Sequence, residues 1–145
     1  MGNLEKDLNT AFKDEWVKAL LNIKYTSGWF DQLGHKALAP YNISEQQYNI
    51  LRILRGAKKA ITVNTVRDRM VQKSPNITRL MDKLCEKALI DRTRCENDRR
   101  VVYVKIAEPG LKLLDDIDLS SFDTPLRKIS EAEARELNRI LDKLR

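Results

Sequence analysis

Residues 61–106 determine the fold of this chain; they read ITVNTVRDRMVQKSPNITRLMDKLCEKALIDRTRCENDRRVVYVKI. Two short segments with helical periodicity come first, and two segments of β-strand character follow. In the second helical segment the apolar residues recur at intervals of three and four, which predicts a helix with one buried face. That face consists of Ile77, Leu80, Met81, Leu84 and Ala88.

This second helix is expected to begin at Ser74 and Pro75. Serine is a favoured N-cap, and proline suits the first helical position because its missing N–H would be unpaired there anyway. The face opposite the apolar one is polar and carries Asn76, Arg79, Asp82, Lys83 and Glu86. Amide, hydroxyl and guanidinium groups of this kind bind base edges and phosphates in the major groove of DNA.

Two β-like segments follow the second helix, at residues 90–95 (IDRTRC) and 101–106 (VVYVKI). Between them lies a polar and charged tip at residues 96–100 (ENDRR). Two strands around a short polar tip are typical of a β-hairpin. Two helices and a hairpin predict a winged helix-turn-helix. Its second helix enters the major groove, and its basic tip reaches phosphates or the next minor groove.

Several short motifs follow one another through this stretch. They are Ile61-Thr62, Ser74, Ile77-Thr78-Arg79-Leu80, Leu84 with Leu89-Ile90-Asp91-Arg92, Asp98-Arg99-Arg100 and Glu108-Pro109-Gly110. Together they resemble the MarR family of bacterial transcription regulators, and the flanking helices stand where that family places them. Three positions depart from the family pattern: Val71 and Ala88 replace the usual glycine, and Ala107 replaces the usual threonine. Ala88 lacks glycine's ease at a helix C-terminus, and Ala107 lacks a capping hydroxyl.

We expect a single domain at residues 1–145 with a mainly α fold that has a small β component (α+β). The winged helix-turn-helix lobe is placed at residues 43–107, and long N- and C-terminal dimerisation helices at residues 1–42 and 108–145. Residues 3–36 are expected to be mostly helical, and residues 120–125 to form a loop. Ser44 and Ser130 each open a capping box, and Gly56 is expected to end the helix that starts after Ser44. Thr62 is expected to cap the first helix of the helix-turn-helix.

The last helix presents one apolar face, made of Ala134, Leu137, Ile140, Leu141 and Leu144. Such a face fits an ordinary intramolecular core as well as a dimer seam. We favour the seam, because helix-turn-helix proteins usually read two half-sites as symmetric homodimers.

The net charge of +6 is concentrated in the middle of the chain. Residues 51–106 hold 15 Lys and Arg against 6 Asp and Glu, whereas the segments on either side are slightly acidic. A basic patch on a helix-turn-helix favours double-stranded DNA as the partner over a merely solvated surface. Four further cations, at positions 52, 55, 58 and 59, fit either DNA backbone contacts or solvent.

The expected DNA-binding residues lie on the second helix and on the wing. They are Ser74, Asn76, Thr78, Arg79, Lys83, Arg94, Asp98, Arg99 and Arg100. The family resemblance implies that Asp98 pairs with Arg100 or a neighbouring arginine and holds the shape of the wing; the alternative is that Asp98 only forms the turn. The resemblance further implies a ligand-responsive repressor that reads a palindromic operator and releases it on binding a small aromatic or phenolic effector.

Other classes of function find little support. The sequence contains no phosphate-binding loop, dinucleotide fingerprint, metal cluster or nucleophile–base pair, so we expect neither an enzyme nor a cofactor. It contains no apolar run long enough for a bilayer and no signal-peptide core, which predicts a cytoplasmic location. A protein–protein adaptor without specific DNA binding is the main alternative, although Arg79 and Lys83 argue against it. Cys85 and Cys95 are expected to be ordinary reduced thiols, with a redox switch as the alternative.

Overall fold

The structure, a computed structural model, describes residues 2–145 and contains two compact units. Residues 35–120 form one unit, which we call the lobe. Residues 2–34 and 121–145 form the other, which we call the helical unit. The lobe includes the helix at Glu108–Asp116, because Leu114 and Ile117 at its end are buried in the lobe core.

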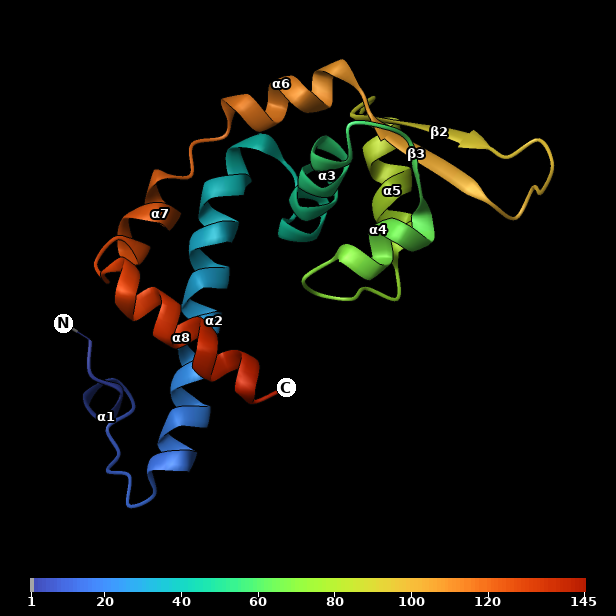
Figure 1. The fold of residues 1–145 in the computed structure, drawn as a ribbon. Helices are drawn as coiled ribbons and strands as arrows, with labels where there is room; N and C mark the ends of the chain where they lie inside the picture. Colours follow the sequence, from blue (N-terminus) through green and yellow to red (C-terminus); the bar gives the residue numbers. More distant parts are fainter. Residues whose placement is uncertain (1) are drawn as a thin grey trace. The chain divides into compact units, whose positions relative to one another are not determined.

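The lobe has the expected winged helix-turn-helix order (Figure 1). Its elements are the 3₁₀ helix η1 (Ala39–Tyr41), α3 (Glu45–Ala57), β1 (Ile61–Thr62), α4 (Val63–Arg69), α5 (Ile77–Glu86), β2 (Ile90–Arg94), β3 (Val102–Ile106) and α6 (Glu108–Asp116). The mainly helical fold with a small β component is therefore confirmed.

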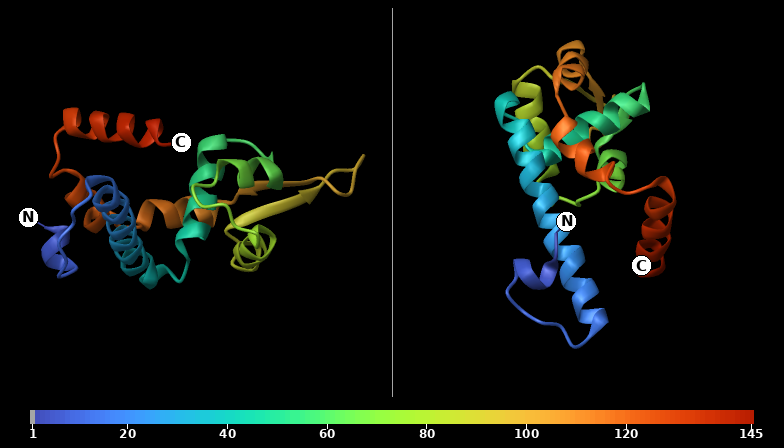
Figure 2. Two further views of the ribbon diagram at one scale, coloured as in Figure 1. Left: turned by 90° about the horizontal axis from the view of Figure 1, so that it is seen from below. Right: turned by 90° about the vertical axis from the view of Figure 1, so that its left-hand side faces the viewer.

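The sheet has three antiparallel strands in the order β1-β3-β2. Ile90 pairs with Ile106 at the inner end of the hairpin, and Arg94 pairs with Val102 next to the tip. The hairpin made by β2 and β3 extends beyond the helices of the lobe and forms the wing (Figures 1 and 2).

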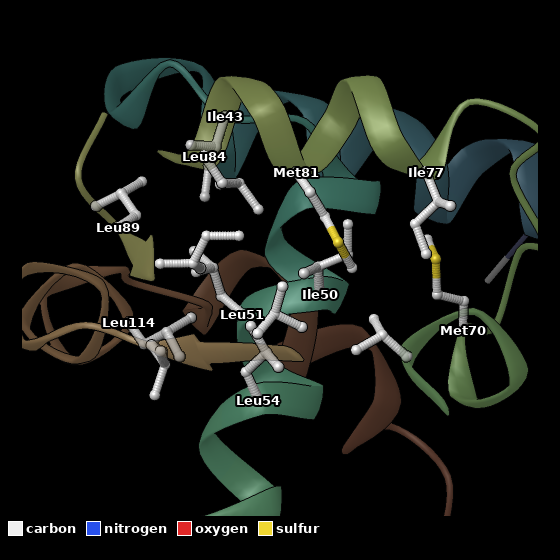
Figure 3. Packing of buried hydrophobic residues seen from close by; sticks show 14 of the residues in the cluster. Ile43, Ile50, Leu51, Leu54, Met70, Ile77, Met81, Leu84, Leu89 and Leu114 are labelled. Carbon is white, nitrogen blue, oxygen red and sulfur yellow. The ribbon is translucent and has the colours of Figure 1, made fainter. Parts of the chain in front are cut away.

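The lobe is built around one apolar core, to which α3, α4, α5, α6 and the sheet all contribute. Figure 3 shows side chains of α3 and α5 meeting in it. Its fully buried members are Ile50, Leu51, Leu54, Val66, Ile77, Met81, Leu84 and Val104. The apolar face expected for α5 is thus confirmed at three of its five positions; Leu80 is only half-buried, and Ala88 is exposed beyond the helix end.

Local capping explains where α3 and α4 begin. The Ser44 hydroxyl accepts a hydrogen bond from the Gln47 N–H at 3.1 Å, and the Gln47 side chain accepts one from the Ser44 N–H at 3.0 Å. The Thr62 hydroxyl accepts one from the Thr65 N–H at 3.1 Å. Both predicted caps are confirmed. The predicted end of α3 at Gly56 was wrong, since the helix continues to Ala57 and Lys58 takes the left-handed conformation there.

The end of α5 is a Schellman motif, in which two backbone hydrogen bonds close the helix. The Leu89 N–H donates to the Leu84 carbonyl at 3.0 Å, and the Ala88 N–H donates to the Cys85 carbonyl at 2.9 Å. Ala88 has a φ of 56°, so it occupies the left-handed position that usually belongs to glycine. The expectation that alanine fits poorly at this helix end therefore has a structural basis.

The helical unit consists of α1 (Leu4–Asp7), most of α2 (Glu15–Leu38), α7 (Ser120–Leu126) and α8 (Glu131–Lys143). The expectation that residues 3–36 are mostly helical is confirmed, although residues 8–14 leave the helical path between α1 and α2. The Asp14 carboxylate caps α2, accepting from the Trp16 N–H at 2.7 Å. The expected loop at 120–125 was wrong. That segment is α7. The centroid of the Phe122 ring lies 5.3 Å from the centroid of the Phe30 ring of α2.

Much of the apolar surface of the helical unit faces outward. Within its described residues, Leu4 is the only buried hydrophobic side chain. The exposed large apolar residues include Trp16, Val17, Leu20 and Ile23 on α2 and Leu137, Ile140 and Leu144 on α8. On α8 these residues follow the i, i+3, i+7 spacing of one helix face. None of the helices formed by residues 2–145 combines the length and the apolarity that a bilayer crossing needs.

Candidate nucleic-acid interface

Helix α5 divides cleanly into a buried face and an exposed polar face. Ile77, Met81 and Leu84 anchor it in the lobe core. Arg79 and Lys83, one turn apart, are exposed on the other side. The helix is therefore held rigidly by its apolar face while its cations remain accessible to a partner.

The segment before α5 differs from the prediction. The helix begins at Ile77 rather than at Ser74, and Asn76 occupies the N-cap position without a capping side-chain hydrogen bond. Ser74 is 7% exposed, and its hydroxyl accepts a hydrogen bond from the Asn76 N–H at 3.2 Å. Ser74 thus shapes the turn before the helix, whereas Asn76 and Thr78 are exposed at its start.

The tip of the wing is organised by Asp98. Its carboxylate accepts a hydrogen bond from the Arg100 backbone N–H at 2.9 Å, and its carbonyl accepts one from the Val101 N–H at 3.0 Å. The expected ion pair between Asp98 and an arginine side chain is not formed within residues 2–145. The turn-forming alternative is the one that the structure shows.

The cations expected to bind DNA have no side-chain partner among the described residues 2–145. Exposed side chains without a hydrogen bond or ion pair there are those of Arg79, Lys83, Arg94, Arg99 and Arg100. Two of them come from the helix and three from the wing. Unpaired cations on two neighbouring elements are well placed for a polyanion, because nothing in the lobe has to be displaced before they bind.

A basic hollow of about 360 Å³ opens where α4, α5 and the wing meet. Its polar lining residues are Thr62, Asn64, Arg67, Thr78, Arg92 and Arg100. Arg67 donates a hydrogen bond to the Asn64 side chain at 2.9 Å, and Arg92 forms an ion pair with Asp82 of α5. This ion pair joins α5, the candidate recognition helix, directly to strand β2 of the wing.

The family model of the transcriptional regulators SarA/Rot matches residues 32–117. The chain belongs to this family. It is also 31% identical to a MarR transcription factor from Planctomyces limnophilus, over 91% of this chain and 98% of that one, with a TM-score of 0.71. The MarR resemblance expected from the sequence motifs is confirmed by this match.

Two further solved structures share the fold of this SarA/Rot-family chain. One is a mutant of MarR from E. coli complexed with operator DNA, 20% identical over 99% of both chains, with a TM-score of 0.76. The other is the organohalide-sensing regulator RdhR-CbdbA1625 in its 2,4-dichlorophenol-bound form. It is 20% identical over 100% of this chain and 85% of that one, with a TM-score of 0.79.

The expected site of this SarA/Rot-family member omitted four of the six polar residues of the hollow, namely Thr62, Asn64, Arg67 and Arg92. Asn64 and Arg67 lie on α4, and Arg92 is two positions before Arg94 on β2. The alternation of strand side chains was a usable signal, since residues two apart on a strand share a face. The meeting of α4 with the wing depends on tertiary packing, and no local pattern reports it.

The Cys85 thiol is a poor candidate for a reactive cysteine. Burial raises the pKa of the Cys85 thiol, and the nearby carboxylate of Asp82 raises it further, while the Arg92 guanidinium acts in the opposite direction. A raised pKa disfavours the reactive thiolate at neutral pH.

Among residues 2–145 no group of three or more His, Cys, Asp or Glu side chains is arranged to hold a metal ion.

Proposed function

We propose that this transcription regulator acts as a homodimer that binds double-stranded DNA sequence-specifically and represses transcription in the cytoplasm until a small effector binds. The observation that carries the DNA-binding proposal is a set of exposed cations with no side-chain partner among residues 2–145, namely Arg79, Lys83, Arg94, Arg99 and Arg100. Arginine suits a bidentate contact to guanine, and wing arginines suit a narrow minor groove. Asn76 and Thr78 add neutral donors and acceptors at the start of α5.

An adaptor that binds only proteins is less compatible with these surfaces. Its recognition face would be neutral or apolar, whereas the exposed face of α5 presents Arg79 and Lys83. The operator complex formed by the E. coli fold relative supports the DNA-binding alternative.

The decisive test is binding to the DNA upstream of the gene for this chain, compared with unrelated DNA over a series of salt concentrations. We expect tight, sequence-selective binding with a steep salt dependence. Arg79→Ala should weaken selective binding by about 1–3 kcal/mol if Arg79 contacts a base, and should weaken all sequences alike if it contacts only phosphate. Unchanged binding would exclude both roles for Arg79.

A matched control for Arg79→Ala is Lys112→Ala, which removes one exposed charge from α6 of the same lobe. We expect little change in selectivity for this control. If both variants lose the same affinity, only the net charge of the lobe matters and the role of Arg79 is excluded.

The dimer is supported by the apolar stripe of Leu137, Ile140 and Leu144 on α8, which is exposed in the single chain. A second copy would cover such a stripe and place two recognition helices on one palindrome. We expect the double variant Leu137→Asp/Ile140→Asp to be monomeric by light scattering and to lose affinity for palindromic DNA. The control Asn138→Asp places the same side chain on α8 outside the stripe and should remain dimeric. A dimeric double variant would exclude α8 from the interface.

The effector proposal is supported by the fold relative that carries 2,4-dichlorophenol. A ligand releases DNA only if it binds the DNA-free state more tightly than the DNA-bound state. Titration of a phenol panel against the protein–DNA complex tests this directly. Release by a subset of phenols supports an effector, and release by none of them removes aromatic phenols from the proposal.

A further inference from the structure

The basic hollow places three arginines around one space without an acidic residue in its lining. Arg67 comes from α4, Arg92 from β2 and Arg100 from the wing tip. None of the lining residues, all of them within the described part of the chain, is Asp or Glu. Like charges gathered in this way repel one another, and an anion between them removes that repulsion.

The three guanidinium groups differ in how far the protein already occupies them. Arg92 is ion-paired with Asp82, and Arg67 donates to the neutral amide of Asn64. The Arg100 side chain makes no hydrogen bond or ion pair with residues 2–145, since only its backbone N–H is engaged, by Asp98. Two of the three positive charges therefore have no countercharge among residues 2–145.

The neutral residues of the hollow complete a set of phosphate-binding groups. Thr62, Asn64 and Thr78 bring hydroxyl and amide groups beside the arginines. Phosphate oxygens in protein–DNA complexes are bound mainly by Arg and Lys together with Ser, Thr, Asn, Gln and Tyr side chains. The guanidinium fork in addition matches the geometry of two phosphate oxygens.

We propose that this hollow is a binding site for one phosphate group of the DNA backbone, which we call the phosphate seat. The phosphate would lie between the bases read by α5 and those approached by the wing. The proposal rests on the proposed DNA-binding function and extends it to Asn64, Arg67 and Arg92. The hollow is lined both by α5, through Thr78, and by the wing, through Arg92 and Arg100. A DNA strand that passes from the major groove to the next minor groove crosses the space between these two elements.

Asp82 acts as a positioning residue in this arrangement. Its ion pair with Arg92 bridges α5 and β2, and it holds that guanidinium at the wall of the hollow. Asp82→Asn removes one negative charge and so raises the net charge of the lobe by one, which by itself strengthens binding to any DNA. Loss of the ion pair should weaken selective binding, because the Arg92 guanidinium is then no longer held at the wall of the hollow.

The first experiment uses the full chain and a duplex selected by the protein from a random-sequence pool. Single backbone phosphates are replaced in turn by uncharged methylphosphonates, and each duplex is tested with the unsubstituted chain, with Arg67→Gln and with the control Lys112→Gln. Arg67→Gln should lower affinity roughly tenfold. It should also reduce the slope of log K against log salt by about 0.9, the value for one phosphate.

The phosphate proposal is tested by whether the affinity losses from the protein substitution and from the methylphosphonate are additive. If Arg67 binds a seated phosphate, one methylphosphonate position per half-site weakens the unsubstituted chain but has little further effect on Arg67→Gln. Lys112→Gln should be additive with every position. Additive losses for Arg67→Gln at all positions, with selective binding by the unsubstituted chain intact, would overturn the phosphate seat alone. Failure of the unsubstituted chain to bind any duplex selectively would overturn the proposed function, and the seat with it.

Asp82→Asn supplies an independent measurement, with Asp68→Asn on α4 as its control. Both variants lose one negative charge, so both should bind unrelated DNA more tightly. Only Asp82→Asn should lose preference for the selected duplex over unrelated DNA. Equal selectivity in the two variants would overturn the positioning role of Asp82.

Inorganic phosphate distinguishes the DNA backbone from a free oxyanion as the source of the bound group. In the absence of DNA, saturable binding of phosphate that is lost in Arg67→Gln, combined with additive methylphosphonate losses, would assign the hollow to a free oxyanion and overturn the DNA assignment. Competition by phosphate beyond that of chloride at equal ionic strength, combined with coupling to one backbone position, is the result expected for the DNA seat.

Discussion

The lobe and the helical unit use their apolar residues in opposite ways. In the lobe, Leu51 is 0% exposed inside a core that the helices and the sheet share. In the helical unit, Trp16 is 85% exposed on α2. The lobe therefore contains the contacts that stabilise its own fold, whereas the helical unit presents apolar surface to solvent in the single chain. In the homodimer proposed above, the DNA-reading elements stay within a rigid lobe while their spacing depends on how the two helical units assemble.

The largest expected effect contrasts these two residues directly. Leu51→Ala should lower the free energy of unfolding by about 2–5 kcal/mol, because it removes buried methyl groups and leaves a cavity. Trp16→Ala should change the stability of the monomer by less than about 0.5 kcal/mol, since its side chain is already in solvent. Urea unfolding followed by circular dichroism, at concentrations where light scattering shows a monomer, measures both. Equal losses would mean that the helical unit has a core of its own.

A second change tests how tightly the lobe is packed at the start of α6. A Cβ added to Gly110 would lie 2.3 Å from the Leu89 carbonyl oxygen and 2.9 Å from Ile106 Cγ1. That carbonyl also accepts the Ala107 N–H at 3.0 Å, so it has little freedom to move. Gly110→Ala should cost about 1–3 kcal/mol in unfolding free energy. The control Gly56→Ala, which meets nothing within 4 Å inside α3, should be neutral or stabilising.

A third change should stabilise the lobe. Ala88 holds the left-handed position of the Schellman motif that ends α5, a conformation that costs a non-glycine residue about 1–2 kcal/mol. Ala88→Gly should recover about 1 kcal/mol after the entropy of the more flexible unfolded chain is subtracted. The thermal midpoint should rise without a change in DNA selectivity. A lower midpoint would mean that the Ala88 methyl group makes a stabilising contact outweighing its strain.

The sequence predicts well those features that depend on residues close together in the chain. Capping by Ser44 and Thr62 and the apolar spacing of α5 depend on neighbours a few residues away, and these predictions were confirmed. The start of α5, assigned to Ser74, was wrong because the burial of this residue and its bond to the Asn76 N–H make it part of the turn. Local pattern does not reveal which side of a turn becomes buried.

Longer-range features were the ones that the sequence did not reveal. Residues 120–126 have the composition of a loop and include Pro125, yet they form α7, where Phe122 packs beside Phe30. The basic hollow unites Arg67 with Arg100, which are 33 positions apart in the chain. In both cases tertiary contacts override local preference.

The smallest expected effect concerns how α8 is held without a buried core of its own. Glu133 accepts hydrogen bonds from the Ser130 N–H at 2.7 Å and the Ser130 hydroxyl at 2.8 Å, and these bonds hold the pKa of its carboxyl below the usual value. A carboxylate with a lowered folded pKa stabilises the fold above its unfolded pKa of about 4.3, and that contribution is lost as the pH falls through the folded value.

Local amide exchange in the first turn of α8 should therefore accelerate as the pH falls below about 4.3, beyond the change in intrinsic exchange rates. Glu133→Gln retains an acceptor for the Ser130 N–H but cannot titrate, so this extra acceleration should be absent. Glu131→Gln removes a charge from the same turn without touching the Ser130 bonds, and it should behave as the unsubstituted chain does. If Glu133→Gln and the unsubstituted chain respond alike, burial of α8 against another surface, rather than its cap, controls the opening of this helix.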